Sequence, residues 1–160
     1  MSLPRGLKLP LAGSALAIAS ALLAFFEGDR LVPYLDSGGV PTDCRGNTDG
    51  VRMGVTRTQA ECDAINQRNL LRVTTGVDRL ITAPVTVPCR AALYDFAYNA
   101  GLGNLRGSTL LRRLNAGDQH GAAAEFDRWV YVRGRDCRLP GSNCAGIVTR
   151  RSVERWLCEV

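Results

Sequence analysis

The distribution of apolar and charged residues divides the chain into one long uncharged run and a series of shorter amphipathic segments. Residues 9–26 carry no charge over eighteen positions, and Arg5 and Lys8 precede them. As a helix, a run of this length would extend roughly 27 Å, which is about the hydrocarbon thickness of a bilayer. Positive residues followed by an apolar run are typical of an export signal. We therefore expect an N-terminal apolar helix that enters a membrane.

The composition of this helix limits how strongly a bilayer would hold it, because alanine, glycine and serine contribute little transfer free energy. Three fates remain open: a cleaved signal peptide, a permanent anchor, or a membrane segment that later leaves the bilayer. A cut after Ala24 would leave Glu27 three residues from a new terminus, where ordering a side chain is difficult. We favour retention, with residues 1–26 as the leader and 27–160 as the main domain.

Beyond the leader, the hydrophobic pattern changes period twice. Residues 30–55 are rich in glycine and proline and contain the short β-favouring stretches LVPYL, GGVPT and DGVRMGV, which predict a small sheet. A capping box then follows, either Thr58 with Glu61 or Thr56 with Gln59. Apolar residues recur after it near helical spacing and predict a long helix that connects the sheet to the rest of the chain; they are Ile65, Leu70, Leu71, Val73, Val77 and Leu80.

The second half of the chain predicts mostly helices. Pro84 and Pro88 break the long helix, and the next apolar face ends at the glycines of NAGLGN. Ser108 and Asp118 are further cap candidates. The stretch RGRDCRLPGSNCAG predicts a loop, and IVTRRSVERWLC predicts a final helix. The fold class that this order favours is α+β.

Length and charge restrict the class of protein further. A chain of 160 residues with 46% hydrophobic content accommodates one core and no second full domain. The net charge is +5, but nineteen arginines and one lysine are spread along the chain rather than gathered in a block. A solvated basic surface is the simpler interpretation, and a polyanion of the bacterial envelope is the alternative partner. Because no motif with interleaved aromatic residues is present, we expect no nucleic-acid binding.

Six cysteines all follow the leader, and their even number fits disulfides in an oxidising compartment. Free thiols are the alternative. A metal site is disfavoured, because no C-x-x-C pair occurs and His120 is the single histidine. The short loop favours a Cys137–Cys144 disulfide. Two further pairs, Cys44 with Cys62 and Cys89 with Cys158, are offered as guesses among the fifteen possible pairings.

The chemistry that the chain suggests lies directly after the leader. Glu27, Asp36 and Thr42 occur at intervals of nine and six in FEGDRLVPYLDSGGVPTDCRGNT. A carboxyl group at a helix end, with a second carboxylate and a hydroxyl beyond a turn, can cleave a glycosidic bond with water and no cofactor. Taken singly, the three residues have ordinary interpretations as a surface carboxylate, a turn former and a strand residue.

Three ordered blocks make the pattern specific, and through them the chain resembles the phage-type lysozymes of glycoside hydrolase family 24. The blocks are the run just quoted, LYDFAYNAGLGNLRGSTLLRRLNAGD, and FDRWV followed by GIVTRRSVERWLC. The resemblance implies a small β lobe and a larger helical lobe, joined by a long helix, that flank a cleft for peptidoglycan. It implies Glu27 as the general acid, beside Phe25 and Phe26 as an apolar setting. Asp36 and Thr42 would position the attacking water.

The resemblance also suggests secondary positions. Tyr98 and Asn99 fall where the helical lobe lines the cleft and are candidates for binding sugar, with core packing and helix capping as the alternatives. Asn47 occupies a place where many relatives carry histidine, so a histidine–carboxylate pair is absent there. For Arg150 and Arg151 we expect a solvated helix face, and for His120 an exposed helix start.

The apolar leader resembles that of signal-arrest-release endolysins, which implies an uncleaved segment, tethered to the inner membrane and then released into the periplasm. The freed helix would refold onto the domain. The expected function is hydrolysis of the β-1,4 bond between N-acetylmuramic acid and N-acetylglucosamine in peptidoglycan, by a monomer without cofactors, causing host lysis. A catalytically inactive peptidoglycan-binding protein and a membrane-disrupting lytic protein are the alternatives.

Overall fold

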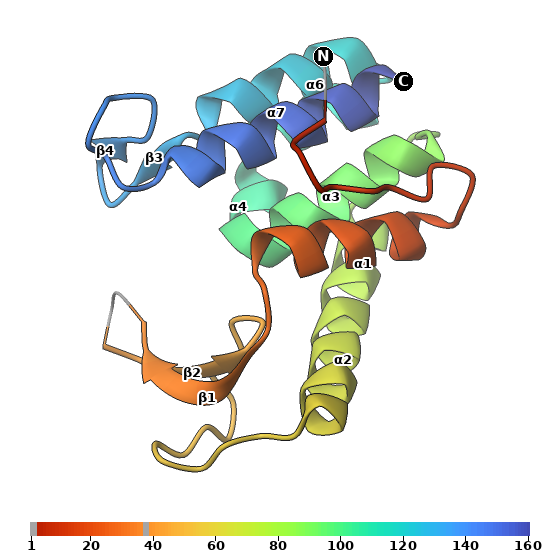
Figure 1. Ribbon diagram of the computed structural model, residues 1–160. Coiled ribbons are helices and arrows are strands. Elements are labelled where there is room, and N and C mark those ends of the chain that lie inside the picture. Colours follow the sequence, from red (N-terminus) through yellow and green to blue (C-terminus); the bar gives the residue numbers. More distant parts are fainter. Residues whose placement is uncertain (1–2, 37–38) are drawn as a thin grey trace.

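The computed structural model describes residues 3–36 and 39–160, and it has the mixed α+β architecture that the sequence predicts (Figure 1). A small β lobe and a larger helical lobe are connected by one long helix. In chain order the elements are α1 (Ala15–Phe26), β1 (Arg30–Leu35), β2 (Pro41–Cys44), α2 (Gln59–Asp78), α3 (Val87–Ala100), α4 (Leu102–Gly107), α5 (Thr109–Asn115), α6 (Gln119–Glu125), a 3₁₀ turn (Phe126–Arg128), β3 (Tyr131–Val132), β4 (Arg135–Asp136) and α7 (Ala145–Glu159).

The β lobe is smaller than the sequence predicts. Strands β1 and β2 form an antiparallel pair in which Tyr34 lies opposite Thr42. The stretch DGVRMGV, expected as a strand, forms turns instead. Only one isolated bridge, between Asp43 and Asn47, extends the pairing beyond β2 in the described part of the lobe. Glycines at positive φ, Gly50 and Gly54, turn this segment away from the sheet.

Local capping signals determine where the helices begin. Thr58 and Glu61 form the capping box of α2, so the alternative with Thr56 is wrong. Ser108 caps α5 and Asp118 caps α6, as predicted. Pro88 lies in the first turn of α3, where its missing N–H is tolerated, so this proline begins a helix rather than breaking one.

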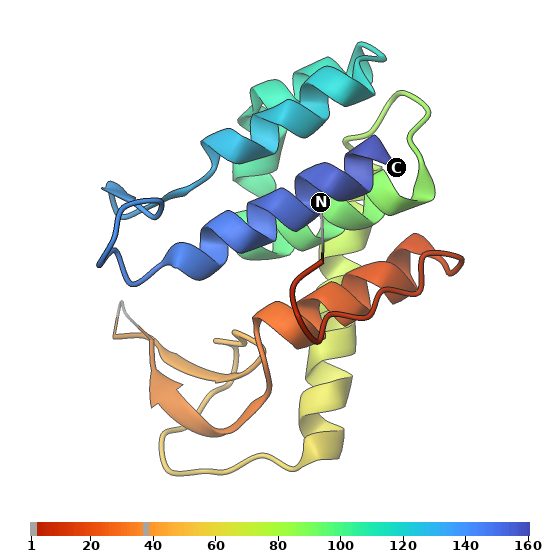
Figure 2. The ribbon, with the colours of Figure 1, turned by 45° about the horizontal axis from the view of Figure 1, so that its top comes forward.

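Helix α3 lies at the centre of the helical lobe, packed between α1 and α7 (Figures 1 and 2). Its residues Ala91–Ala97 are buried on every side of the helix. Such all-round burial explains why the amphipathic pattern of this segment is weak, because a helix in the middle of a core needs no polar face.

The second half of the leader is part of this core. Ile18, Ala19 and Leu22 of α1 are fully buried, and Leu7 of the preceding segment is buried as well. Burying a side chain such as Ile18 or Leu22 stabilises the fold by about 1.5–3 kcal/mol. Helix α1 is shorter than the apolar run, because it begins after Ser14, whose hydroxyl accepts a hydrogen bond from the Ala17 N–H. Within the described residues, no helix is both long and apolar enough to span a bilayer.

Three disulfides connect the elements, and they are the three pairs named from the sequence. Cys44–Cys62 joins β2 to α2, Cys89–Cys158 joins the first turn of α3 to the last turn of α7, and Cys137–Cys144 closes the loop before α7. All six cysteines are thereby paired. The stretch RGRDCRLPGSNCAG was expected to be a loop, but it contains the short strand β4, which pairs with β3 directly before the stretch.

Candidate active site

Glu27 lies at the C-terminal end of α1, where the chain leaves the helical lobe for the β lobe. Its N–H donates to the Leu23 carbonyl and completes the last turn of the helix. Its carboxylate accepts a hydrogen bond from Arg150 Nη1 of α7 at 2.6 Å. About a quarter of the Glu27 side chain is exposed (23%), whereas that of Arg150 is 4% exposed. The carboxylate therefore has one edge in solvent and one edge on a buried guanidinium.

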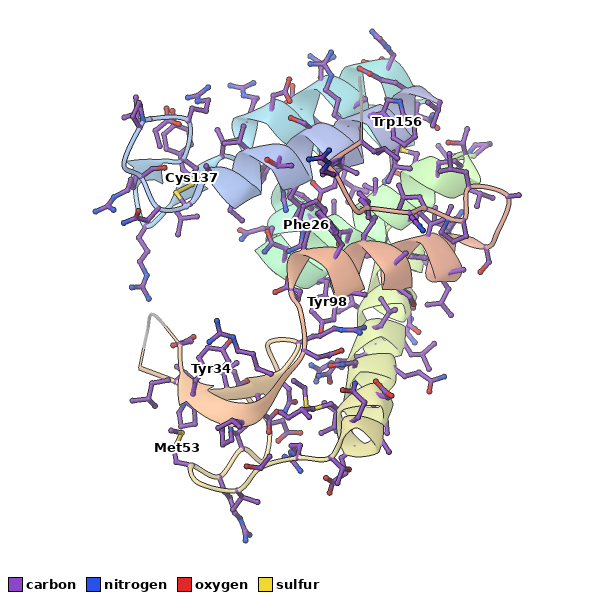
Figure 3. All side chains as sticks on the ribbon, in the orientation of Figure 1. Phe26, Tyr34, Met53, Tyr98, Cys137 and Trp156 are labelled. Atoms are coloured by element: carbon purple, nitrogen blue, oxygen red, sulfur yellow. A yellow bond between two sulfur atoms is a disulfide. The ribbon has the colours of Figure 1, made fainter. Side chains whose placement is uncertain are left out.

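This setting differs from the apolar one that Phe25 and Phe26 predict. The Phe26 ring, labelled in Figure 3, lies against the Arg150 guanidinium, with 5.3 Å between the guanidinium carbon and the ring centroid. Phe25 packs edge-on against Phe26 and is partly exposed. An arginine, rather than an apolar wall, is thus the immediate neighbour of Glu27.

Arg150 is itself held by a second carboxylate from the central helix. Asp95 of α3 is fully buried and accepts from Arg150 Nε at 2.8 Å and from Nη2 at 2.9 Å. Burial alone would lower the pKa of Arg150, but the charges of Asp95 and Glu27 outweigh it and raise this pKa, so the guanidinium stays positive. Three side chains from α1, α7 and α3 consequently form one line of alternating charge.

Asp36 and Thr42 lie together at the far end of the β hairpin. Asp36 directly follows β1, and its Oδ1 accepts a hydrogen bond from the Val40 N–H at 2.9 Å. Thr42 is buried in β2, and its Oγ1 donates to the Val40 carbonyl at 2.9 Å. Residues 37–38, between the two strands in the sequence, lie outside the described residues. The hairpin thus brings Asp36 and Thr42 to one place, and Glu27 precedes its first strand.

A buried polar cluster supports the strand that carries Thr42. Asp43 accepts hydrogen bonds from Arg57 Nε at 2.9 Å and from Asn47 Nδ2 at 2.7 Å. The backbones of Asp43 and Asn47 also exchange two hydrogen bonds of 2.9 Å. Asn47 therefore makes the contact to a carboxylate that the family's histidine was expected to make, with its amide as the donor.

Tyr98 and Asn99, the candidates for binding sugar, each make a polar contact with another part of the protein. The Tyr98 hydroxyl, labelled in Figure 3, donates to the Arg45 carbonyl at 2.8 Å and so links α3 to the β lobe. The Asn99 Oδ1 accepts from Arg151 Nη2 at 2.7 Å. Burial raises the pKa of Tyr98 to about 12, and the negative charge of Glu27 adds to this shift. Contacts of these two residues with sugar remain a prediction.

The prediction for Arg150 and Arg151 is wrong, because both side chains are buried. Arg151 lies over the Phe96 ring, with 4.8 Å between the guanidinium carbon and the ring centroid, and its Nε is 2.9 Å from Glu154 Oε2. Arginine is usually solvated, but two buried carboxylates, Asp95 on α3 and Glu154 on α7, reverse that preference here. His120 is exposed at the start of α6, as expected.

Asp95 was not among the residues predicted for the site, although the sequence contains a feature that indicates its buried charge. Asp95 stands within LYDFA, among apolar residues that lie on every side of one helix. A carboxylate in the middle of a buried helix requires a cationic partner. The i, i+4 spacing of Arg150 and Glu154 on a second apolar helix offers such a partner.

The arrangement suits acid–base chemistry on an uncharged bond. One carboxyl group at a helix end could donate a proton, while a second carboxylate and a hydroxyl on a separate hairpin could orient water. One cavity lies elsewhere: it has a volume of about 260 Å³, is lined by residues of α1 and α2 and by Arg45 and Tyr98, and none of the three predicted catalytic residues lines it.

Comparisons with known proteins identify the family and the fold of the chain. Residues 24–154 match the family model described as phage lysozyme. The SAR-endolysin of Bacteriophage PS119 is 40% identical over 155 residues, which cover 92% of this chain and 89% of the relative.

Among solved structures, the muramidase domain of SpmX from Asticaccaulis excentricus superposes with a TM-score of 0.78 at 27% identity, covering 89% of this chain and 95% of that domain. The endolysin Lyz of P1 phage shares the fold. Its active form gives a TM-score of 0.76 at 24% identity, covering 92% of this chain and 86% of that one. Its secreted inactive form gives 0.51 at 19% identity, covering 92% and 90%.

Proposed function

Because the chain belongs to the phage lysozyme family, we propose that Glu27 is the acid with which it cleaves the glycan strands of peptidoglycan. The protein is a lysozyme, a glycoside hydrolase that degrades peptidoglycan for host lysis. Its bond is the β-1,4 linkage between N-acetylmuramic acid and N-acetylglucosamine. In our proposal the Glu27 carboxyl protonates the bridging oxygen of that linkage, which makes the departing sugar a neutral alcohol.

The other two residues act on the opposite side of the sugar ring. The Asp36 carboxylate orients water and stabilises the positive charge that develops on the ring. Thr42 fixes the approach of the water by a hydrogen bond. The shared contact of Asp36 and Thr42 with Val40 supports this pairing, because both side chains are hydrogen-bonded to the backbone of one residue.

We propose that residues 9–26 tether the protein to the inner membrane before it acts in the periplasm as a monomer. Its relatives named SAR-endolysins, such as that of Bacteriophage PS119, support the order of membrane insertion and later release. The burial of Ile18 and Leu22 in the helical lobe supports refolding of the freed segment onto the domain. Tethered, α1 would be missing from the lobe and Glu27 would lack Arg150, so the enzyme would be inactive.

The observation that carries the proposed function is the position of Glu27 at a helix end, with one carboxylate edge exposed and one edge held by Arg150. The test is Glu27→Gln in the full-length protein, extracted from membranes and refolded with its disulfides. The amide oxygen of glutamine can still accept the hydrogen bond from Arg150, but glutamine has no acidic proton to transfer to the glycosidic oxygen. We expect the release of muropeptides from purified peptidoglycan to fall by about 10²–10⁴-fold.

A matched control is Glu159→Gln, which removes a carboxylate paired with Arg155 at the exposed end of α7. We expect this variant to digest peptidoglycan at the wild-type rate. Undiminished digestion by Glu27→Gln would refute the role of Glu27. Lysis of cells by that variant without soluble muropeptides would instead favour a membrane-disrupting protein.

A further inference from the structure

The line of alternating charge at the active site raises a question about the proton of Glu27. A guanidinium 2.6 Å from a carboxylate favours the ionised carboxylate, whereas a general acid has to carry a proton when substrate binds. An unopposed Arg150 would therefore work against the reaction that Glu27 performs. The structure contains a buried group that opposes it.

Asp95 meets the requirements for such a group. Its two carboxylate oxygens accept two hydrogen bonds from Arg150, in the bidentate geometry that is typical of strong arginine–carboxylate pairs. Asp95 is fully buried, so no water screens this contact. The bidentate pair leaves only Nη1 of Arg150 to face Glu27.

The other charged and titratable groups around the pair do not serve the same purpose. In the described part of the site they are Tyr98 on α3, Arg151 and Glu154 on α7, and Arg45 and Arg72 near Tyr98. Glu154 is the other buried carboxyl group, but its nearer oxygen is 3.8 Å from Arg150 Nε. Burial raises the pKa of Glu154 well above its ordinary value, against the charge of Arg151, so Asp95 supplies the opposing charge.

We propose that Asp95 is a positioning residue for the hydrolytic reaction: by accepting two hydrogen bonds from one edge of the Arg150 guanidinium it fixes this group against Glu27 and offsets its charge, so that Glu27 retains the proton it donates. This inference rests on the proposed role of Glu27. It assigns Asp95 no contact with substrate.

The test is Asp95→Asn in the full-length, disulfide-bonded protein, assayed on peptidoglycan from pH 4 to 9. Asparagine is nearly isosteric and retains an acceptor for Arg150, but it has no charge. The alkaline limb of the kcat profile should move by about one unit toward lower pH, because an unopposed positive charge within 4–6 Å favours the ionised acid by at least that much. At pH 7 we expect kcat to fall about tenfold and KM to change less than twofold.

Glu125→Gln is the matched control. Glu125 is a largely buried carboxylate in the same lobe, paired with Arg113 and Arg128, and it is not part of the active site. Its loss should lower the midpoint of thermal unfolding and leave the pH profile in place. A merely structural role for Asp95 would give the same pattern as this control.

Asp95→Asn leaves a buried arginine with one carboxylate fewer, so the variant could fail to fold. The charge-balanced double variant Asp95→Asn with Arg150→Gln removes both charged partners. Its pH profile tests the proposal even if Asp95→Asn alone does not fold. Without the guanidinium, the alkaline limb should lie at or above the wild-type pH, although kcat falls because Glu27 is no longer held. If Asp95→Asn folds, its alkaline limb should lie at the lowest pH, that of the wild type at a higher pH, and that of the double variant at or above the wild-type value.

Two outcomes would overturn the inference: an alkaline limb of Asp95→Asn that coincides with that of the wild type, or a limb of the double variant that lies below it. Glu27→Gln, measured in parallel, separates the two proposals. If Glu27→Gln is inactive and Asp95→Asn has an unchanged profile, only the inference about Asp95 fails. If Glu27→Gln is active, the proposed function itself fails.

Discussion

At the scale of single residues, the burial of charge is what distinguishes this helical lobe. Arg150, Arg151, Asp95 and Glu154 are all inside it, although each of these residue types is normally exposed. Burying an ion pair is a poor way to gain stability, because the desolvation penalty can exceed the attraction. The network next to Glu27 is therefore better explained by the chemistry that it supports than by the stability of the fold.

Tyr98 leads to a prediction at this scale. Its hydroxyl connects α3 to the β lobe through the Arg45 carbonyl, and Tyr98→Phe should destabilise the protein by about 1 kcal/mol at pH 7. The folded pKa of about 12 exceeds the ordinary value of 10. The stabilising contribution of the hydroxyl is thus complete below pH 10 and decreases as the pH rises toward 12.

Urea unfolding at pH 7, 9 and 11 measures this effect. The difference between wild type and Tyr98→Phe should be equal at pH 7 and 9 and smaller at pH 11. Tyr131→Phe, which changes an exposed ring, serves as the control and should have little effect at any of these pH values. A difference that increases between pH 9 and 11 would contradict the prediction.

At the scale of elements, the caps explain why most of the helices begin where the sequence places them. Thr58 Oγ1 accepts from the Glu61 N–H, and Glu61 Oε2 accepts from the Thr58 N–H. Both contacts lie within four residues, so they need no tertiary structure to form. The short helix α4 lacks a side-chain cap and was not predicted. It depends on packing, because so short a helix does not sustain itself in water.

Thr58→Ala provides a prediction for α2. Removing the cap should lower the free energy of unfolding at pH 7 by about 1 kcal/mol. The pKa of Glu61 is lowered first by its hydrogen bond from the Thr58 backbone N–H and next by that from the Thr58 hydroxyl. Thr58→Ala removes the hydroxyl contact, whose contribution is present above pH 4.5 and decreases as the pH falls below that value.

The measurement is urea denaturation of both proteins at pH 7 and pH 3. The difference between wild type and Thr58→Ala should be smaller at pH 3. Thr56→Ala is the matched control, because Thr56 is exposed two residues away and is not the cap. A loss for Thr56→Ala as large as that for Thr58→Ala would show that the cap is not responsible.

At the scale of the whole molecule, the sequence of α1 has to suit two environments: the bilayer of the proposed tethered form and the folded protein in water. One side of it, with Ile18, Leu22 and Leu23, is buried against the helical lobe. The other side, with Ala17 and Ala24, is exposed to water in the folded enzyme. Alanine on that side keeps the segment apolar enough to enter a bilayer and weak enough to leave it, under the proposed release.

Ala17→Leu with Ala24→Leu tests this balance. The two substitutions lie on the exposed side, so the folded enzyme should retain its stability to within about 0.5 kcal/mol. Each adds three carbons, and a buried CH₂ contributes about 0.8 kcal/mol to partition into the membrane. The variant should remain in the membrane fraction and lyse its host later than the wild type.

Membrane fractionation over the time course of lysis provides the readout. Leu22→Ala is the converse control, because it makes the leader less apolar and removes a fully buried side chain. The free energy of unfolding should fall by about 2–5 kcal/mol. Lysis at the wild-type time by Ala17→Leu with Ala24→Leu, despite normal expression, would contradict the proposed release.

The sequence alone determined the features that depend on neighbours along the chain. The caps at Thr58, Ser108 and Asp118 were correct because capping is a contact over three residues. The α+β class followed from the change between the turn-rich segment and the helical periods. The spacing of Glu27, Asp36 and Thr42 within a recognisable motif indicated the chemistry.

Tertiary structure alone decided which partners those residues meet. No local pattern pairs Glu27 with Arg150, 123 residues away, or Arg150 with Asp95, 55 residues away. For the same reason Arg150 and Arg151 were expected in solvent. The strand expected at DGVRMGV failed because a strand forms only where a neighbour has free backbone groups to pair with it. Contacts between neighbours in the sequence thus determine where most of the predicted elements lie. Contacts between residues far apart in the sequence determine which charged groups surround Glu27.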